Sequence, residues 1–123
     1  MTTGGIPGID VHEAAARVAS DERPRPLIVD VREPDEFVAV RVDGVAHVPM
    51  SGFLLRAGEL PKERPLLVLC ASGARSAAVT GYLLRSGWTD VANIDGGITA
   101  WQRAGLPVRR GPLAPGEGTL PTG

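Results

Sequence analysis

The sequence has little of what metal centres, disulfide frameworks and nucleic-acid surfaces require. Its 123 residues include one cysteine and two histidines, so no internal disulfide can form and no zinc or iron–sulfur site is expected. The formal net charge of −1 provides no basic field for nucleic acid or an anionic membrane. The single thiol of the chain is Cys70.

Long apolar runs are also missing. No run approaches the length of a membrane span, and the first ten residues, MTTGGIPGID, lack the charged and apolar regions of a signal peptide. A free thiol in such a chain favours the reducing cytoplasm, so we expect a cytoplasmic protein with no membrane partner. Hydrophobic residues make up 43% and charged residues 22%, which suits the core of one folded domain.

Short apolar runs alternate with helical patterns along most of the chain. The runs 27–31, 66–70 and 91–94 predict buried strands, another short strand is expected to end at Pro49, and 106–108 is a candidate for a last strand. Helical patterns occupy the intervening segments 11–20, 32–38, 51–60, 74–87 and 96–105. Because parallel neighbouring strands need crossover connections, this alternation predicts an α/β fold with a parallel sheet.

The two ends of the chain are rich in glycine and proline. We expect a flexible arm over residues 1–8, a folded domain over 9–110 and a disordered tail over 111–123, because the ends have little to bury.

Cys70 stands where an apolar strand gives way to a helix, at the edge where open parallel sheets bind ligands. The residues that follow, expected to bind substrate, are Ala71, Ser72, Gly73, Ala74, Arg75 and Ser76. A loop of small residues can turn its N–H groups inward as an anion-binding nest, and a helix N-terminus adds positive potential. Such surroundings lower the pKa of a thiol, so the pattern predicts a nucleophilic Cys70. A buried packing cysteine is the competing interpretation, and for lone cysteines it is the commoner one.

Three segments together resemble the rhodanese-like family, specifically a stand-alone single domain. They are DVREPDEF (30–37), CASGARS (70–76) and DGGITAWQRAGLPV (95–108). The resemblance implies a five-stranded parallel sheet flanked by helices on both faces, with no metal or organic cofactor. It also implies a thiosulfate sulfurtransferase, in which Cys70 takes the sulfane sulfur of a small anionic donor as a persulfide. A nucleophilic acceptor, cyanide or a thiol, then removes that sulfur.

Other activities remain open on this fold. One alternative is a carrier that receives sulfur from a protein donor and passes it to a protein acceptor. The residue Ala71 favours this carrier, because thiosulfate-active relatives often have a polar or cationic residue there. Phosphatase and arsenate-reductase loops have one more residue between Cys and Arg than the Cys70–Arg75 segment, so sulfur transfer is preferred to both. Val40, Arg41 and His47 also depart from the family pattern, and we interpret them as surface or packing variation.

Two loop residues have competing roles. Arg75 would bind an anionic donor or pair with a nearby carboxylate, and Ser76 would cap the helix or donate to the sulfur, with capping preferred. Asp30 and Arg32 lie near the end of a predicted strand and, by the resemblance, are expected to support the loop.

The remaining polar and aromatic candidates are given structural roles. The acids Glu33, Asp35 and Glu36 are interpreted as favouring a helix dipole. Surface or packing roles are expected for four more residues: His12, His47, Trp88 and Trp101.

Overall fold

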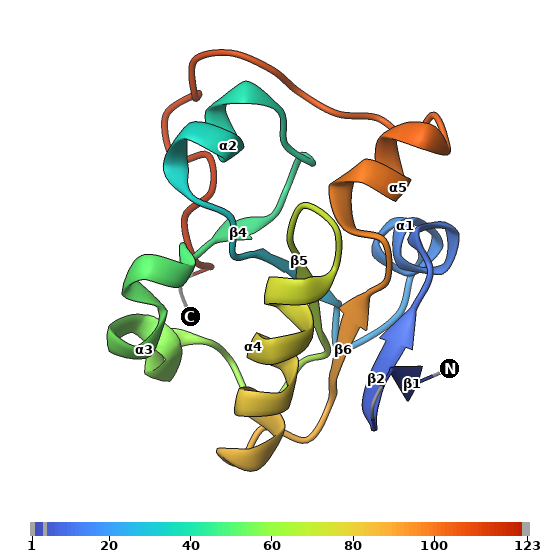
Figure 1. Ribbon diagram of the computed structural model, residues 1–123, viewed down its shortest axis with the longest axis vertical. Helices are drawn as coiled ribbons and strands as arrows, with labels where there is room; N and C mark the ends of the chain where they lie inside the picture. The colour runs from blue at the N-terminus through green and yellow to red at the C-terminus, as the bar shows by residue number, and fades with distance from the viewer. Residues whose placement is uncertain (1, 4, 122–123) are drawn as a thin grey trace.

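The computed structural model describes residues 2–3 and 5–121 and contains one six-stranded sheet (Figure 1). Its strands are β1 (Thr2–Thr3), β2 (Ile6–Ile9), β3 (Leu27–Asp30), β4 (Ala46–His47), β5 (Leu66–Leu69) and β6 (Val91–Ile94). The α-helices are α1 (Val11–Ala19), α2 (Pro34–Ala39), α3 (Phe53–Arg56), α4 (Ala74–Arg85) and α5 (Gly97–Arg103). Short 3-10 turns η1 (Met50–Gly52) and η2 (Ala57–Glu59) flank α3.

The predicted five-stranded parallel sheet is confirmed, in the order β2-β6-β5-β3-β4. The two-residue strand β1 adds an antiparallel edge that the sequence did not predict. The fifth parallel strand is β2, whereas the candidate segment 106–108 forms no strand and is followed only by an isolated bridge between Arg41 and Arg109. The expectation of a flexible arm over residues 1–8 is thus corrected for residues 2–3 and 6–8, which form strands, while residues 1 and 4 lie outside the described chain.

Gly8 explains why β2 escaped prediction, because glycine normally weakens a strand pattern. A Cβ atom at Gly8 would lie 2.5 Å from Oδ2 of Asp95, so the glycine makes room for a carboxylate at the end of the neighbouring strand. β2 pairs with β6 in parallel, with Ile9 opposite Ile94.

Helices cover both faces of the sheet, as predicted. Side chains alternate along the central strands: Val68 packs toward α3 and α4, whereas Leu67 and Leu69 pack toward α1, α2 and α5. The strand β5 is therefore buried on both faces, and its carboxyl end presents Cys70 to the loop before α4.

The described part of the C-terminal segment, residues 111–121, is packed against the domain, which corrects the expectation of a disordered tail there. Figure 1 shows it passing from α5 across α2 toward the region of β4 and α3. The amide of His47 donates to Gly118 O at 2.7 Å, and Gly111 N donates to Val38 O at 2.9 Å. The physical reason is Arg41, which is 1% exposed and forms a bidentate ion pair with Glu117.

Among the described residues 2–3 and 5–121, no helix has the length and apolar character needed to cross a membrane.

Candidate active site

Cys70 lies in the loop between β5 and α4. The backbone conformation of this loop at position 73 favours glycine. Gly73 precedes α4 with φ of 108°, a left-handed conformation that other residues adopt only with strain. Cys70 itself is 1% exposed. A sulfur so deeply placed is expected to react only with small reagents that can enter the loop.

Backbone amides and one hydroxyl surround the sulfur. Gly73 N donates to Cys70 Sγ at 3.1 Å, and Ser76 Oγ lies 3.2 Å from the same atom. Burial opposes ionisation of the thiol, but the Ser76 hydroxyl and the amides of Ser76, Gly73 and Ser72 outweigh it and lower the pKa of Cys70 below its ordinary value. The loop thus turns these amides toward the sulfur at a helix N-terminus, which is the geometry expected of a nest.

The N-terminus of α5 holds the loop in this orientation. Ile98 N donates to Cys70 O at 2.9 Å, and Thr99 N donates to Ala71 O at 3.1 Å. In a trans peptide the N–H points opposite to the C=O, so anchoring the Ala71 carbonyl on α5 turns the Ser72 amide the other way. Gly97 permits the approach, because a Cβ there would lie 2.4 Å from Cys70 O.

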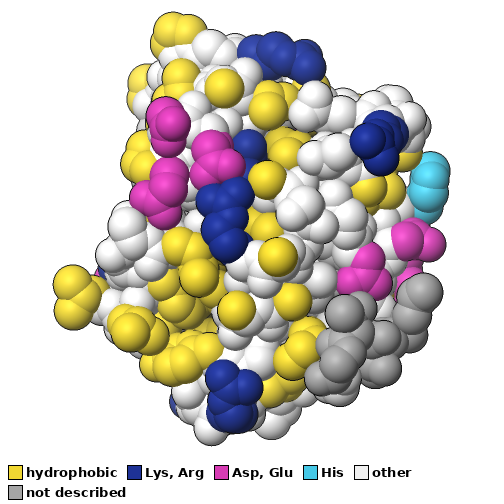
Figure 2. All heavy atoms as spheres, in the orientation of Figure 1, with side chains coloured by type: hydrophobic (Ala, Val, Ile, Leu, Met, Phe, Trp, Pro, Cys, Tyr) yellow, Lys and Arg dark blue, Asp and Glu magenta, His cyan; other side chains and the backbone are white. Residues whose placement is uncertain are grey.

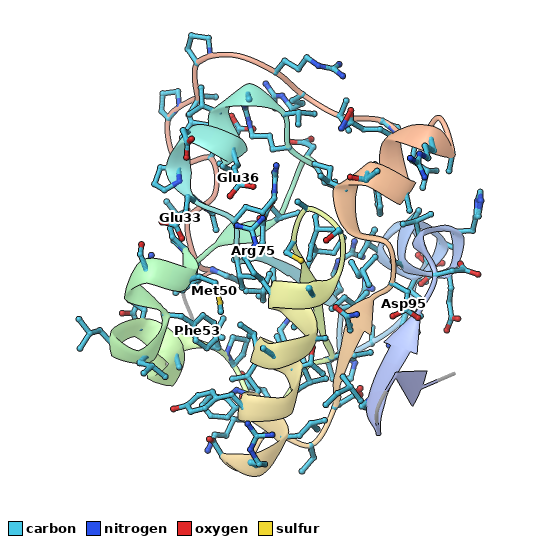
Figure 3. The ribbon with its side chains drawn as sticks, viewed as in Figure 1. Glu33, Glu36, Met50, Phe53, Arg75 and Asp95 are labelled. Carbon is cyan, nitrogen blue, oxygen red and sulfur yellow. The ribbon has the colours of Figure 1, made fainter. Side chains whose placement is uncertain are left out.

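Arg75 is paired with a carboxylate. Its two terminal nitrogens donate to Glu36 Oε1 at 2.7 Å and Oε2 at 2.9 Å, and Figure 3 shows the two side chains facing each other between α4 and α2. The side-chain bond from Arg75 lowers the pKa of Glu36 to about 2, and the bond with Glu36 raises the pKa of Arg75. Of the two roles left open for Arg75, this structure contains the pairing with Glu36, a residue expected only to favour a helix dipole.

Asp30 and Arg32 form a buried ion pair one strand away. Arg32 Nη2 donates to Asp30 Oδ2 at 2.9 Å and to Val40 O at 2.6 Å, and its Nη1 donates to Glu36 O at 3.2 Å. This pair therefore fixes the backbone of α2, the helix whose Glu36 side chain meets Arg75.

Ser76 does not cap α4, contrary to the preferred expectation. The N-cap is Gly73, without a side-chain cap bond, and Ser76 lies within the first turn with its hydroxyl toward the sulfur. The same hydroxyl contacts Oδ1 of Asn93, whose amide donates to Asp95 Oδ1 at 3.1 Å. Sequence reasoning missed Asn93; the available signal was its place at the end of a strand, just before the DGG segment.

Neither histidine lies in the loop. His12 is exposed, and His47 stacks on Phe37 with ring centroids 4.1 Å apart while its Nε2 lies 2.7 Å from Arg32 O. Both indoles are buried in the core clusters, Trp88 beside α4 and Trp101 on α5, as expected. No three acidic, histidine or cysteine side chains within the described chain gather as a metal site.

Three exposed hydrophobic residues lie around α3, and we call them the α3 patch: Met50, Leu54 and Leu55, which are 37%, 72% and 92% exposed. Met50 and Leu54 of this patch also line a groove of about 270 Å³ between α3 and α4, together with Phe53, Ala78 and Tyr82. Figure 2 shows this hydrophobic area below the acidic and basic side chains at the centre left of the molecule, and Figure 3 labels Met50 and Phe53 just below Arg75.

The fold and the loop define an α/β domain with a cysteine surrounded by backbone amides at the carboxyl end of a central strand. The profile of the rhodanese-like domain matches residues 10–104, and the chain belongs to this family of sulfurtransferases.

Relatives agree with this assignment. A sulfurtransferase of Allochromatium vinosum is 38% identical over 100 residues, covering 81% of this chain and 92% of that protein. Thiosulfate sulfurtransferase GlpE of Vibrio cholerae is 31% identical over the same shares of the two chains.

Solved structures have the same fold. A rhodanese-related protein of Thermoplasma volcanium superposes with a TM-score of 0.76 at 26% identity, covering 84% of this chain and 97% of that one. A thiosulfate sulfurtransferase of Pseudomonas aeruginosa gives 0.75 at 30% identity, covering 88% of this chain but 21% of that one.

Proposed function

We propose that the protein is a thiosulfate sulfurtransferase that works through a persulfide on Cys70. The observation that carries the proposal is the Cys70 sulfur, held by the Gly73 amide and the Ser76 hydroxyl in a loop that lowers its pKa. The relative named thiosulfate sulfurtransferase GlpE supports the choice of donor. A free thiol suits the cytoplasm, which we propose as the location.

The first step transfers the sulfane sulfur to the enzyme. The Cys70 thiolate attacks the outer sulfur of thiosulfate, a sulfur–sulfur bond forms, and sulfite leaves with the electron pair of the bond that breaks. The negative charge then lies on the outer sulfur of the persulfide. The amides of the loop stabilise this anion as they stabilise the thiolate.

The second step returns the enzyme to its starting state. An acceptor such as cyanide attacks the outer sulfur, forms thiocyanate and releases the Cys70 thiolate with the bonding pair. No proton is gained or lost by Cys70 over the cycle, so neither step needs a general base. The reaction is expected to follow ping-pong kinetics.

The test is thiocyanate production from thiosulfate and cyanide. Wild type is expected to turn over, and mass spectrometry after thiosulfate alone is expected to find one added sulfur atom. Cys70→Ser is expected to lose both signals, because a serine hydroxyl is not ionised near neutral pH. Ser86→Ala, at the opposite end of α4, serves as the control. Turnover that survives in Cys70→Ser contradicts the proposal.

The α3 patch and the Arg75–Glu36 pair favour a second candidate, a sulfur relay between proteins. The loop's arginine is already paired with Glu36, and Figure 3 labels Glu33 and Glu36 above Met50 of the α3 patch, an apolar surface that a small anion would not use. The partner that fits is a protein segment with apolar and basic side chains around its thiol. A wild type that turns over no thiosulfate, yet takes a persulfide from a cysteine desulfurase, would select this candidate.

A further inference from the structure

The hydroxyl of Ser76 has more acceptors around it than protons to donate. Its oxygen lies 3.2 Å from Cys70 Sγ, 3.2 Å from Gly73 O, and closest of all to Asn93 Oδ1. A serine hydroxyl carries one proton, so it donates to one of these atoms at a time. All three residues around the oxygen are buried, and no competition from bulk water is expected there.

Asp95 fixes which end of the Asn93 amide meets Ser76. The amide nitrogen of Asn93 donates to Asp95 Oδ1 at 3.1 Å, so its oxygen faces the serine. Asn93 is 3% exposed, which leaves that oxygen dependent on Ser76 for a donor. Gly8 leaves the space for the Asp95 carboxylate, which Figure 3 shows at the end of β6, away from Arg75.

We propose that Asn93 is a positioning residue that competes with Cys70 for the Ser76 proton, so that the hydroxyl changes partner with the charge on the sulfur. This proposal rests on the proposed role of Cys70 as nucleophile. When Cys70 is a neutral thiol, Ser76 donates to Asn93 Oδ1 and its oxygen accepts from the thiol. When the thiol loses its proton to solvent, Ser76 turns to the sulfur and Asn93 Oδ1 loses its donor.

The persulfide restores the first arrangement. Its inner sulfur carries no charge, because the charge has moved to the outer sulfur, and the Ser76 proton returns to Asn93. A buried carbonyl without a donor is costly, so Asn93 disfavours the free thiolate and supports the persulfide. Asn93 thereby disfavours ionisation of the free Cys70 thiol and does not destabilise the Cys70 persulfide.

The test is the pH profile of Cys70 alkylation by iodoacetamide, which reports the thiolate directly. Ser76→Ala removes the donor to the thiolate and is expected to slow alkylation about tenfold at pH 6. Asn93→Leu removes the competing acceptor and is expected to accelerate alkylation at pH 6 by about threefold.

The double variant Ser76→Ala/Asn93→Leu distinguishes competition for the Ser76 proton from a general effect of Asn93 on the loop. Asn93 acts through Ser76, so Asn93→Leu is expected to change nothing in a Ser76→Ala background. An equal acceleration in both backgrounds, or none in either, overturns the proposal. The matched control is Thr80→Val, because Thr80 is buried in α4 and donates to the Ser76 carbonyl at 2.8 Å but not to its hydroxyl; its profile is expected to match wild type.

Asp95→Ala tests the same idea without altering the buried side chain of Asn93. The freed amide can turn its NH₂ toward Ser76, so alkylation at pH 6 is expected to rise in wild type more than in the Ser76→Ala background. If the rate of alkylation rises equally with and without Ser76, loss of the Asp95 charge alone explains the effect, and this outcome counts against the proposal.

Other charges near Cys70 are constant across these comparisons. They are the Arg75–Glu36 pair from α4 and α2, Glu33 before α2, the Asp30–Arg32 pair at the end of β3, and Asp95 itself where it is not replaced. Alkylation requires only a reactive thiol, so this test can fail or succeed independently of the sulfurtransferase activity. If the protein produces no thiocyanate but Asn93→Leu accelerates alkylation only when Ser76 is present, the proposed reaction is rejected and the competition for the Ser76 proton is supported.

Discussion

Among single residues, the Arg75–Glu36 pair decides how much positive charge an incoming anion meets. The guanidinium is the one cation in the segment 70–76, and both of its terminal nitrogens are engaged by one carboxylate. The pair is partly exposed, with side-chain exposures of 36% and 31%, so solvent screens it and a strong anion can compete for it. Under the proposed function, Glu36, which lies outside the loop, is expected to limit donor affinity.

Glu36→Gln is expected to improve thiosulfate binding. Removing the negative charge frees the Arg75 guanidinium for the donor, and KM for thiosulfate is expected to fall about threefold, the scale of a partly exposed ion pair. Steady-state thiocyanate assays measure this, with Asp35→Asn as the control because Asp35 is an exposed acid on the same helix. An unchanged or higher KM would show that Arg75 does not bind the donor.

Among secondary-structure elements, the contact between α5 and the Cys70 loop determines the shape of the nest. The two bonds from Ile98 and Thr99 orient peptides that lie 27 or more residues earlier in the chain. Gly97, with φ of 58°, allows the backbones to approach. The amides around the sulfur are thus positioned by a helix that contributes no side chain to them.

Gly97→Ala is expected to disrupt sulfur transfer. The added methyl group would lie 2.4 Å from Cys70 O and 2.5 Å from Ala71 O, so the loop must move. A displacement of about 1 Å at a reacting atom costs on the order of a hundredfold in rate.

Gly105→Ala separates this clash from backbone strain. Gly105 also has positive φ, 74°, but a Cβ there meets nothing within 4 Å. Its expected cost is on the order of 1–2 kcal/mol of unfolding free energy with activity retained. Equal activities of the two variants would contradict the role given to α5.

For the whole molecule, one buried arginine is a main attachment of the C-terminal segment. Arg41 donates to the Glu117 carboxylate on one side and to the carbonyl of Gly111 at 2.8 Å on another. The bond from Arg41 is the main cause that lowers the pKa of Glu117 to about 2. Removing the partner of a buried charge lowers the free energy of unfolding by more than removing the partner of an exposed charge does.

Glu117→Gln is expected to lower the melting temperature by about 5 °C at pH 7. Because the folded pKa is about 2 and the ordinary value 4.5, the ionised carboxylate stabilises the fold above pH 4.5, and this contribution is lost as the pH falls toward 2. The difference from wild type should therefore shrink between pH 5 and pH 3 in thermal melts. Glu59→Gln, at an exposed acid, is the control, and equal melting temperatures for both variants would refute the prediction.

The sequence identifies features that depend on local pattern and misses those that depend on distant partners. The buried strands and the Cys70 loop are readable because periodicity and a strand–loop–helix order mark them. Strand β2 is not predicted because Gly8 weakens its strand pattern, and Gly8 is needed there to leave space for the Asp95 carboxylate. The packed tail is hidden because glycine and proline dominate it, whereas its attachment depends on Arg41, 76 residues from Glu117.

The dependence of the Cys70 loop on α5 also orders events during biosynthesis. The thiol leaves the ribosome before Gly97 and Ile98 do, so the nascent chain carries an ordinary cysteine without its oriented amides. We therefore expect the lowered pKa of the thiol to appear only after α5 docks, and truncated products ending before α5 are expected to carry a thiol closer to an ordinary cysteine.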